Sequence, residues 1–173
     1  MRPNVWIRGQ YFLPSENEWY KAAYYDPNKT GGAGYYDYAT GSDTAPSPVA
    51  SGTSGAVYNG QSSPADITSA GGLSPYGTMG QGGNVWDWME TNYSGTNDAS
   101  ASARGLRGGS WGNVGYLASS ARNGSGPSDE IYIVGFRVAS SELAAVPEPT
   151  TLLSTLALVS SGLLLRRRGK GSL

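Results

Sequence analysis

The side chains of this sequence that could carry out chemistry are carboxylates and arginines, because the chain contains no cysteine and no histidine. Thiolate nucleophiles, imidazole bases and Cys/His zinc sites are therefore excluded for this sequence. A bound metal would need oxygen ligands, which calcium and magnesium prefer. Acid–base work would fall to Asp66, Asp87, Asp129 or Glu130, and no two of these carboxylates form a recognisable catalytic pair.

Asp87 lies between two tryptophans, directly after a glycine-rich stretch, in the segment YGTMGQGGNVWDWME at 76–90. One interpretation is a half-buried strand whose aspartate accepts hydrogen bonds from the backbone amides of the glycine loop. The other is a calcium site, in which the carbonyls of Gly83 and Val85 and the carboxylate of Asp87 converge on the ion. The residues alone leave both open.

Four arginines are dispersed among aromatic residues in the C-terminal part of the body, where the segments 104–111, 120–124 and 134–141 predict two or three short strands. They could clamp an anionic ligand. Arginines in such surroundings more often stack on rings and bind loop carbonyls, which favours a structural role. The four are Arg104, Arg107, Arg122 and Arg137.

The segment FLPSENEWYKAAYY at 12–25 predicts a helix. Ser15 and Glu18 have the spacing of a capping box, and Trp19, Ala22 and Ala23 fall on one face. Residues 28–75 have almost no periodic apolar pattern but are rich in tyrosine, which predicts ordered, irregular structure. With 26 glycines and 10 prolines in the chain, we expect a loop-rich fold.

The body of the chain is acidic, because residues 1–165 contain 8 basic and 13 acidic side chains. A nucleic-acid groove needs a cationic surface, so no nucleic-acid partner is expected. The remaining four basic residues all lie in the last eight positions, and they belong to a separate C-terminal segment.

This C-terminal segment begins at Val146 and has three parts: an extended Pro147-Glu148-Pro149 box, an uncharged leucine-rich stretch at 150–165, and the cluster Arg166, Arg167 and Arg168. The arrangement predicts an apolar C-terminal helix with a membrane stop at the arginines. The alternative is a C-terminal core helix. The tail resembles the PEP-CTERM sorting signal of bacteria, which implies recognition by an exosortase-type enzyme. It also implies export across the inner membrane, at least transient membrane anchoring, and a final place in the cell envelope or extracellular matrix.

Five motifs in the body resemble, in this order, the sulfatase-modifying-factor family, whose founding activity is formylglycine generation. They are LPSENEWYKAA, SPYGTMGQGGNVWDW, RGLRGGSW, SAR and GFRVA, and together they extend from about Phe12 to Ala139. The resemblance implies an α+β, C-type-lectin-like fold with little regular structure.

The resemblance also implies what the site holds. Family members that make formylglycine bind copper through a cysteine pair, and the matching positions here are Asn113 and Ala118, so no copper is expected. The family's calcium site matches Gly83, Val85 and Asp87, although Gly80 falls where the family often has a side-chain ligand. Calcium is therefore the expected cofactor.

We expect a partial family domain at 1–141, a linker at 142–146 and the sorting signal at 147–173. The N-terminal part of the domain and a signal peptide are expected upstream of Phe12, so the sequence is expected to begin inside a longer gene. The predicted function is an exported, surface-associated, non-catalytic module that binds a glycan or a surface protein. The alternatives are a formylglycine-generating-type oxidase or other enzyme of the family, or a gene remnant without function.

Overall fold

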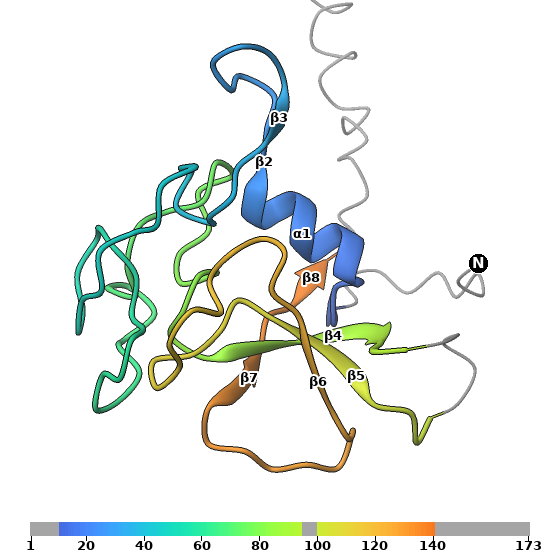
Figure 1. Ribbon diagram of the computed structural model, residues 1–173. Coiled ribbons are helices and arrows are strands. Elements are labelled where there is room, and N and C mark those ends of the chain that lie inside the picture. Colours follow the sequence, from blue (N-terminus) through green and yellow to red (C-terminus); the bar gives the residue numbers. More distant parts are fainter. Residues whose placement is uncertain (1–10, 95–99, 141–173) are drawn as a thin grey trace, which may run out of the picture. The chain divides into compact units, whose positions relative to one another are not determined.

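A computed structural model describes residues 11–94 and 100–140, and one compact unit spans Tyr11–Ala139. Its elements alternate with long irregular segments (Figure 1). In chain order they are β1 (Tyr11–Phe12), α1 (Glu16–Tyr24), β2 (Tyr25–Asp26), β3 (Gly34–Tyr35), β4 (Trp86–Asn92), β5 (Arg104–Arg107), β6 (Asn123–Ser125), β7 (Val134–Phe136) and β8 (Ala139–Ser140).

The predicted helix is confirmed as α1, and its start is fixed by local chemistry. The Ser15 side chain accepts a hydrogen bond from the backbone N–H of Glu18, and the Glu18 carboxylate accepts one from the backbone N–H of Ser15 at 2.8 Å. This capping box satisfies two donors that a helix start otherwise leaves without partners. The helix ends at Tyr24, one residue before β2.

The main sheet has the strand order β6-β5-β4-β7 and combines both kinds of pairing. β4 pairs with β5 and β5 with β6 in antiparallel fashion, whereas β4 and β7 run parallel, with Trp88 opposite Phe136. The expected short strands in the C-terminal part of the body are thereby confirmed. Two further two-stranded pairs, β1-β8 and β2-β3, complete the described sheets.

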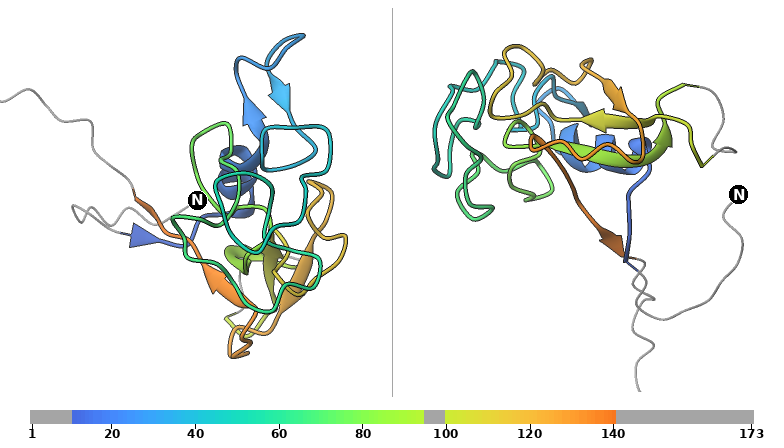
Figure 2. Two further views of the ribbon diagram at one scale, coloured as in Figure 1. Left: turned by 90° about the vertical axis from the view of Figure 1, so that its left-hand side faces the viewer. Right: turned by 90° about the horizontal axis from the view of Figure 1, so that it is seen from below.

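Helix α1 lies across one face of this sheet, over β4 (Figure 2). The core between them consists of Trp19, Ala23 and Tyr24 from the helix, Met89 from β4 and Ala39 from a loop. The rings of Trp19 and Tyr24 meet edge to face, with centroids 5.8 Å apart. Because α1 has nine residues, it depends on this packing for its stability.

Between β3 and β4 the chain forms irregular loops beyond the end of the sheet where β4 begins (Figure 1). Isolated bridges such as that between Val57 and Gly83 hold these loops together. This mixed architecture, with one short helix among the described residues, agrees with the expected loop-rich α+β fold. The expected apolar C-terminal helix lies outside the described residues.

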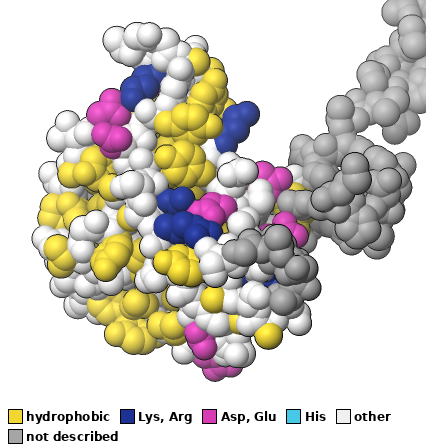
Figure 3. Space-filling view, turned by 45° about the vertical axis from the view of Figure 1, so that its right-hand side comes forward, with side chains coloured by type: hydrophobic (Ala, Val, Ile, Leu, Met, Phe, Trp, Pro, Cys, Tyr) yellow, Lys and Arg dark blue, Asp and Glu magenta, His cyan; other side chains and the backbone are white. Residues whose placement is uncertain are grey.

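A second set of interactions ties the start of α1 to the sheet through the Glu16 carboxylate. Glu16 Oε1 accepts hydrogen bonds from Nε of Arg107 and Nε of Arg122, both at 2.7 Å. The two arginines also donate to backbone carbonyls, among them those of Ser119 and Asn92. Figure 3 shows basic and acidic side chains side by side on one face of the molecule, surrounded by apolar ones.

The pKa of Glu16 lies below its ordinary value of 4.5. Burial alone would raise it, but the hydrogen bonds and charges of Arg122 and Arg107 outweigh that effect. The carboxyl group is therefore protonated more readily in the unfolded chain than in the folded one. Its contribution to stability is present above pH 4.5 and is lost as the pH falls through the lowered folded-state pKa.

We predict that Glu16→Gln lowers the free energy of unfolding by about 2 kcal/mol at pH 7, because two guanidinium groups lose a charged acceptor. The difference between the variant and the wild type should shrink as the pH falls below 4.5. Urea unfolding at a series of pH values measures both effects. The control Glu130→Gln removes an exposed carboxylate and should leave the pH profile unchanged. A constant difference down to pH 3 would contradict the assigned role of the ionised Glu16 carboxylate.

Candidate functional site

Asp87 lies on β4 and is buried, with 2% of its surface exposed. Its Oδ2 atom accepts a hydrogen bond from the indole Nε1 of Trp19 at 3.0 Å and another from Nε of Arg137 at 2.7 Å. Burial raises the pKa of this carboxyl group, while the charge of Arg137 and the two hydrogen bonds oppose the rise. The donors are therefore two side chains, and not the glycine-loop amides that one interpretation of the sequence suggested.

Gly83 and Val85 lie in the segment that leads into β4. Gly83 has φ +84°, and its N–H donates to the Gly108 carbonyl at 2.8 Å. A Cβ atom added at Gly83 would collide with the carbonyl oxygen of Val57. Val85 is half-buried and packs closely against Gly135, where an added Cβ would lie 3.0 Å from Cγ2 of Val85. Close chain packing thus explains the glycine at position 83 without a metal.

Whether calcium fits these residues depends on Arg137, because its guanidinium group already pairs with the Asp87 carboxylate. The Arg137 guanidinium bonds to Asp87 through Nε and donates through Nη2 to the Met79 carbonyl at 2.7 Å, beside Gly80. A divalent ion at Asp87 Oδ2 would meet this positive charge at close range, so the donor set as arranged does not fit it. Within residues 11–94 and 100–140 no three Asp or Glu side chains gather to supply another site. These contacts argue against the calcium expected from the sequence at Gly83, Val85 and Asp87, and added calcium tests that expectation directly.

Asn113 and Ala118, which the resemblance matches to copper-binding cysteines, have other contacts in this structure. Asn113 Oδ1 accepts hydrogen bonds from Nε1 of Trp86 and from the Ser110 hydroxyl, both at 2.6 Å. Ala118 is half-buried and forms an isolated bridge with Tyr38. The Asn113 amide therefore joins the start of β4 to the loop that follows Ser110.

The four arginines behave as the structural interpretation predicts. Each donates to at least one backbone carbonyl, and three of them also pair with a buried or half-buried carboxylate. The carbonyls are those of Glu90 for Arg104, Ser119 and Ala121 for Arg107, Tyr93 and Asn92 for Arg122, and Met79 for Arg137. The carboxylates are those of Glu16 and Asp87.

Several loops meet around Trp111. Its backbone N–H donates to the Asn84 carbonyl at 2.8 Å, and its own carbonyl accepts from the Gln61 N–H at 2.9 Å. The Tyr132 ring lies 5.8 Å from the Trp111 ring between centroids, tilted by 50°, and Tyr132 is 81% exposed. Val114 and Tyr116, on the same loop as Trp111, are also exposed. The sequence analysis did not single out Tyr132, because nothing in its immediate neighbourhood signals a partner twenty-one positions upstream.

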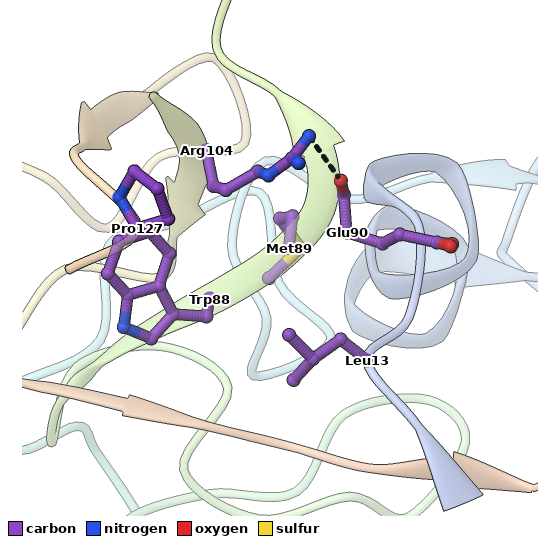
Figure 4. Close-up of a pocket in the computed structure, with 6 residues that line it drawn as sticks. All are labelled: Leu13, Trp88, Met89, Glu90, Arg104 and Pro127. Carbon is purple, nitrogen blue, oxygen red and sulfur yellow. Dashed lines mark hydrogen bonds between the residues drawn. The ribbon is translucent and has the colours of Figure 1, made fainter. Parts of the chain in front are cut away.

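A separate pocket of about 330 Å³ opens beside β4 and β5 (Figure 4). The Arg104 side chain is turned to the Glu90 carbonyl, and the Glu90 carboxylate points away from the ring of Trp88. The pocket therefore presents mainly apolar surface. Its lining residues are Leu13, Trp88, Met89, Glu90, Arg104 and Pro127.

The sorting box Pro147, Glu148 and Pro149 and the arginines 166–168 lie outside the described residues. In the part of the chain that the structure does describe, no helix has the length and apolar character needed to cross a membrane.

Comparison with known proteins gives one family and two similar folds. The family model "Sulfatase-modifying factor enzyme 1-like domain" matches residues 5–142. Treponema denticola variable protein 1 is 24% identical, with a TM-score of 0.51, and the protein named CarF is 23% identical, also at 0.51. Each likeness covers 74% of this chain and 46% of the other one, so this chain spans about half the length of those proteins. No curated protein matches.

We predict that Gly83→Ala is more destabilising than Gly31→Ala by at least about 2 kcal/mol. Both glycines have positive φ, +84° and +94°, so both substitutions strain the backbone. Only at Gly83 does the added methyl group meet another chain segment, since nothing lies within 4 Å of it at Gly31. Urea unfolding of the two variants measures the difference, and equal costs would contradict the packing role of Gly83.

Arg137→Gln should lower the free energy of unfolding by about 3 kcal/mol, because it leaves the buried Asp87 carboxylate without its cation. Lys29→Gln is the control, since it breaks a pair with the exposed Asp43 and should have little effect. Added calcium should not raise the unfolding temperature of the wild type. A calcium-dependent rise that disappears in Asp87→Asn would instead establish a metal at this carboxylate.

Proposed function

The chain belongs to the sulfatase-modifying factor family, and we propose that it serves there as a non-catalytic binding module displayed at the cell surface. The observation that carries the proposal is the hydrogen bonding of the Asn113 side chain within the protein. In the oxidases of the family a thiolate at this position binds copper, whereas here an amide oxygen accepts two hydrogen bonds within the protein. An amide oxygen is a poor ligand for Cu(I), which selects soft sulfur donors.

The electrostatic environment also supports a role without catalysis. The half-buried Glu16 carboxylate is bonded to arginines, and the buried Asp87 carboxylate is bonded to an arginine and an indole N–H. Asp66 and Asp129 are exposed, and hydrogen bonds to neighbouring residues hold the pKa of each below its ordinary value. A general base that works near neutral pH needs a raised pKa, which Asp66 and Asp129 lack. The pKa of Asp87 is raised by burial, but that carboxylate is 2% exposed and already accepts hydrogen bonds from Trp19 and Arg137.

Binding is supported by the kind of surface that the loops present. Tyr132 is exposed beside the Trp111 ring, and Tyr116 is exposed on the loop that follows Trp111 and packs against the Trp86 ring. Exposed aromatic rings on a rigid framework are typical of recognition surfaces, because they offer contact area at low entropic cost. Glycans and surface proteins are the two ligand classes that such a surface suits.

Display at the surface is proposed from the sequence of the tail. A Pro147-Glu148-Pro149 box, a leucine-rich stretch and the cluster Arg166–Arg168 have the order of a PEP-CTERM signal. In this proposal an exosortase-type enzyme processes the chain during its passage to the cell envelope or extracellular matrix. The tail serves at least transiently as the membrane anchor.

We predict that the chain forms no aldehyde on a sulfatase-motif peptide in the presence of copper and oxygen, because it has no thiolate to bind the metal. Mass spectrometry of the peptide measures the outcome, with an active formylglycine-generating enzyme as the positive control. The same preparation should be retained by immobilised cell-envelope material.

Copper-dependent aldehyde formation that exceeds a no-enzyme control would overturn the non-catalytic role. Absence of retention on untreated envelope material would overturn the binding role. Treating the envelope material with periodate, which destroys sugars, or with a protease, which destroys proteins, identifies the ligand class.

A further inference from the structure

The indole N–H of Trp111 is buried and has no hydrogen-bond acceptor among the described residues. Such donors are rare in folded proteins, because an indole N–H removed from water without a partner costs free energy. Other indoles of the same fold are satisfied, since Trp19 donates to Asp87 and Trp86 donates to Asn113. The Trp111 donor therefore calls for an explanation at its own site.

The backbone of Trp111 is anchored by neighbouring loops. Hydrogen bonds to Asn84 and from Gln61 hold the residue between two loops. The Asn84 side chain in turn bonds the backbone of Ala65 through both its oxygen and its nitrogen. The backbone that carries the indole thus lies at the junction of three segments that are distant in sequence.

Tyr132 lies next to this indole and is 81% exposed, which is unusual for a ring that packs on another ring. Its neighbour Ile131 is also exposed, and the Val134 N–H donates to the Ile131 carbonyl at 2.9 Å, which shapes the turn into β7. The turn therefore presents the phenol ring to solvent beside the Trp111 ring. A ligand that stacks on Tyr132 lies close to the Trp111 indole.

The chemistry of the surroundings selects an uncharged ligand. The unpartnered donor of Trp111 is neutral. The turn that carries Tyr132 also carries Asp129 and Glu130, whose charges disfavour phosphate, sulfate or carboxylate ligands. A ring with apolar faces and uncharged oxygen acceptors at its edge fits both observations, and a neutral sugar has this chemistry.

We propose that Trp111 and Tyr132 form a saccharide subsite, in which a neutral sugar ring stacks on Tyr132 and an oxygen of the sugar accepts the Trp111 N–H. The proposal rests on the binding function proposed above, and it commits to glycans over proteins. The Trp111 N–H is covered in the structure, so the proposal requires the exposed Tyr132 ring to move aside before the sugar oxygen reaches it.

The test uses the full chain and titration calorimetry with four probes: dextran and the hexasaccharides of glucose, mannose and N-acetylglucosamine. We expect the wild type to bind at least one of them. Trp111→Phe keeps an aromatic ring but removes the N–H, and it should weaken that binding about tenfold. Tyr132→Ser should weaken it by at least about tenfold, because it removes the stacking surface.

Tyr76→Ser is the matched control. It removes a half-exposed tyrosine from a different loop and should change the affinity less than about twofold. Circular dichroism and thermal unfolding report whether each variant is folded. If Trp111→Phe does not fold, Tyr132→Ser carries the test, since that side chain is mostly exposed.

Sugar binding that both variants retain would overturn the assigned subsite and leave the binding function standing. If no probe binds but protease-sensitive envelope material retains the chain, the ligand is a protein and the saccharide proposal fails. If neither sugar nor envelope material binds, the proposed function fails together with the subsite.

Discussion

The fold depends on one buried carboxylate oxygen, Oδ2 of Asp87. It joins helix α1 through Trp19, the chain after β7 through Arg137, and its own strand β4 at the centre of the main sheet. The Met79 carbonyl, which accepts from the same guanidinium, adds the loop before β4. A buried carboxylate is costly unless it is paired and hydrogen-bonded, and here both conditions are met by residues that are far apart in sequence. Four segments are thereby held to one arrangement.

This arrangement matters because regular structure supplies little of the order in this protein. β2, β3 and β8 have two residues each, and the loops between β3 and β4 are held by single bridges and turns. Their backbone groups find partners across loops, as when the Asn84 N–H donates to Val57 and the Gly83 N–H to Gly108. The close approach at Gly83 is possible only without a side chain. Contacts between loops therefore order the chain in this protein, as long strands do in other folds.

What the sequence could predict follows from the range of the interactions. The capping box of Ser15 and Glu18 acts over three residues, so the start of α1 could be read from the sequence. The short strands in the C-terminal part of the body could be read from local composition. The partners of Asp87 could not, because Trp19 lies 68 positions upstream and Arg137 lies 50 positions downstream. The sequence offered backbone amides or calcium for the same carboxylate, and no local pattern distinguishes these from a distant guanidinium.

The same limit applies to the candidate site, where Trp111 and Tyr132 meet only because β7 lies beside β4. The Trp86 N–H donates to the Ile133 carbonyl, which places the turn of Tyr132 against the loop of Trp111. Asn113 serves this placement as well, since its side chain joins Trp86 to Ser110. The Asn113 side chain, which the resemblance matches to a copper-binding cysteine, is thus part of the scaffold that holds the aromatic pair. Loops fixed in this way lose little conformational entropy when a ligand binds, which supports the proposed role in recognition.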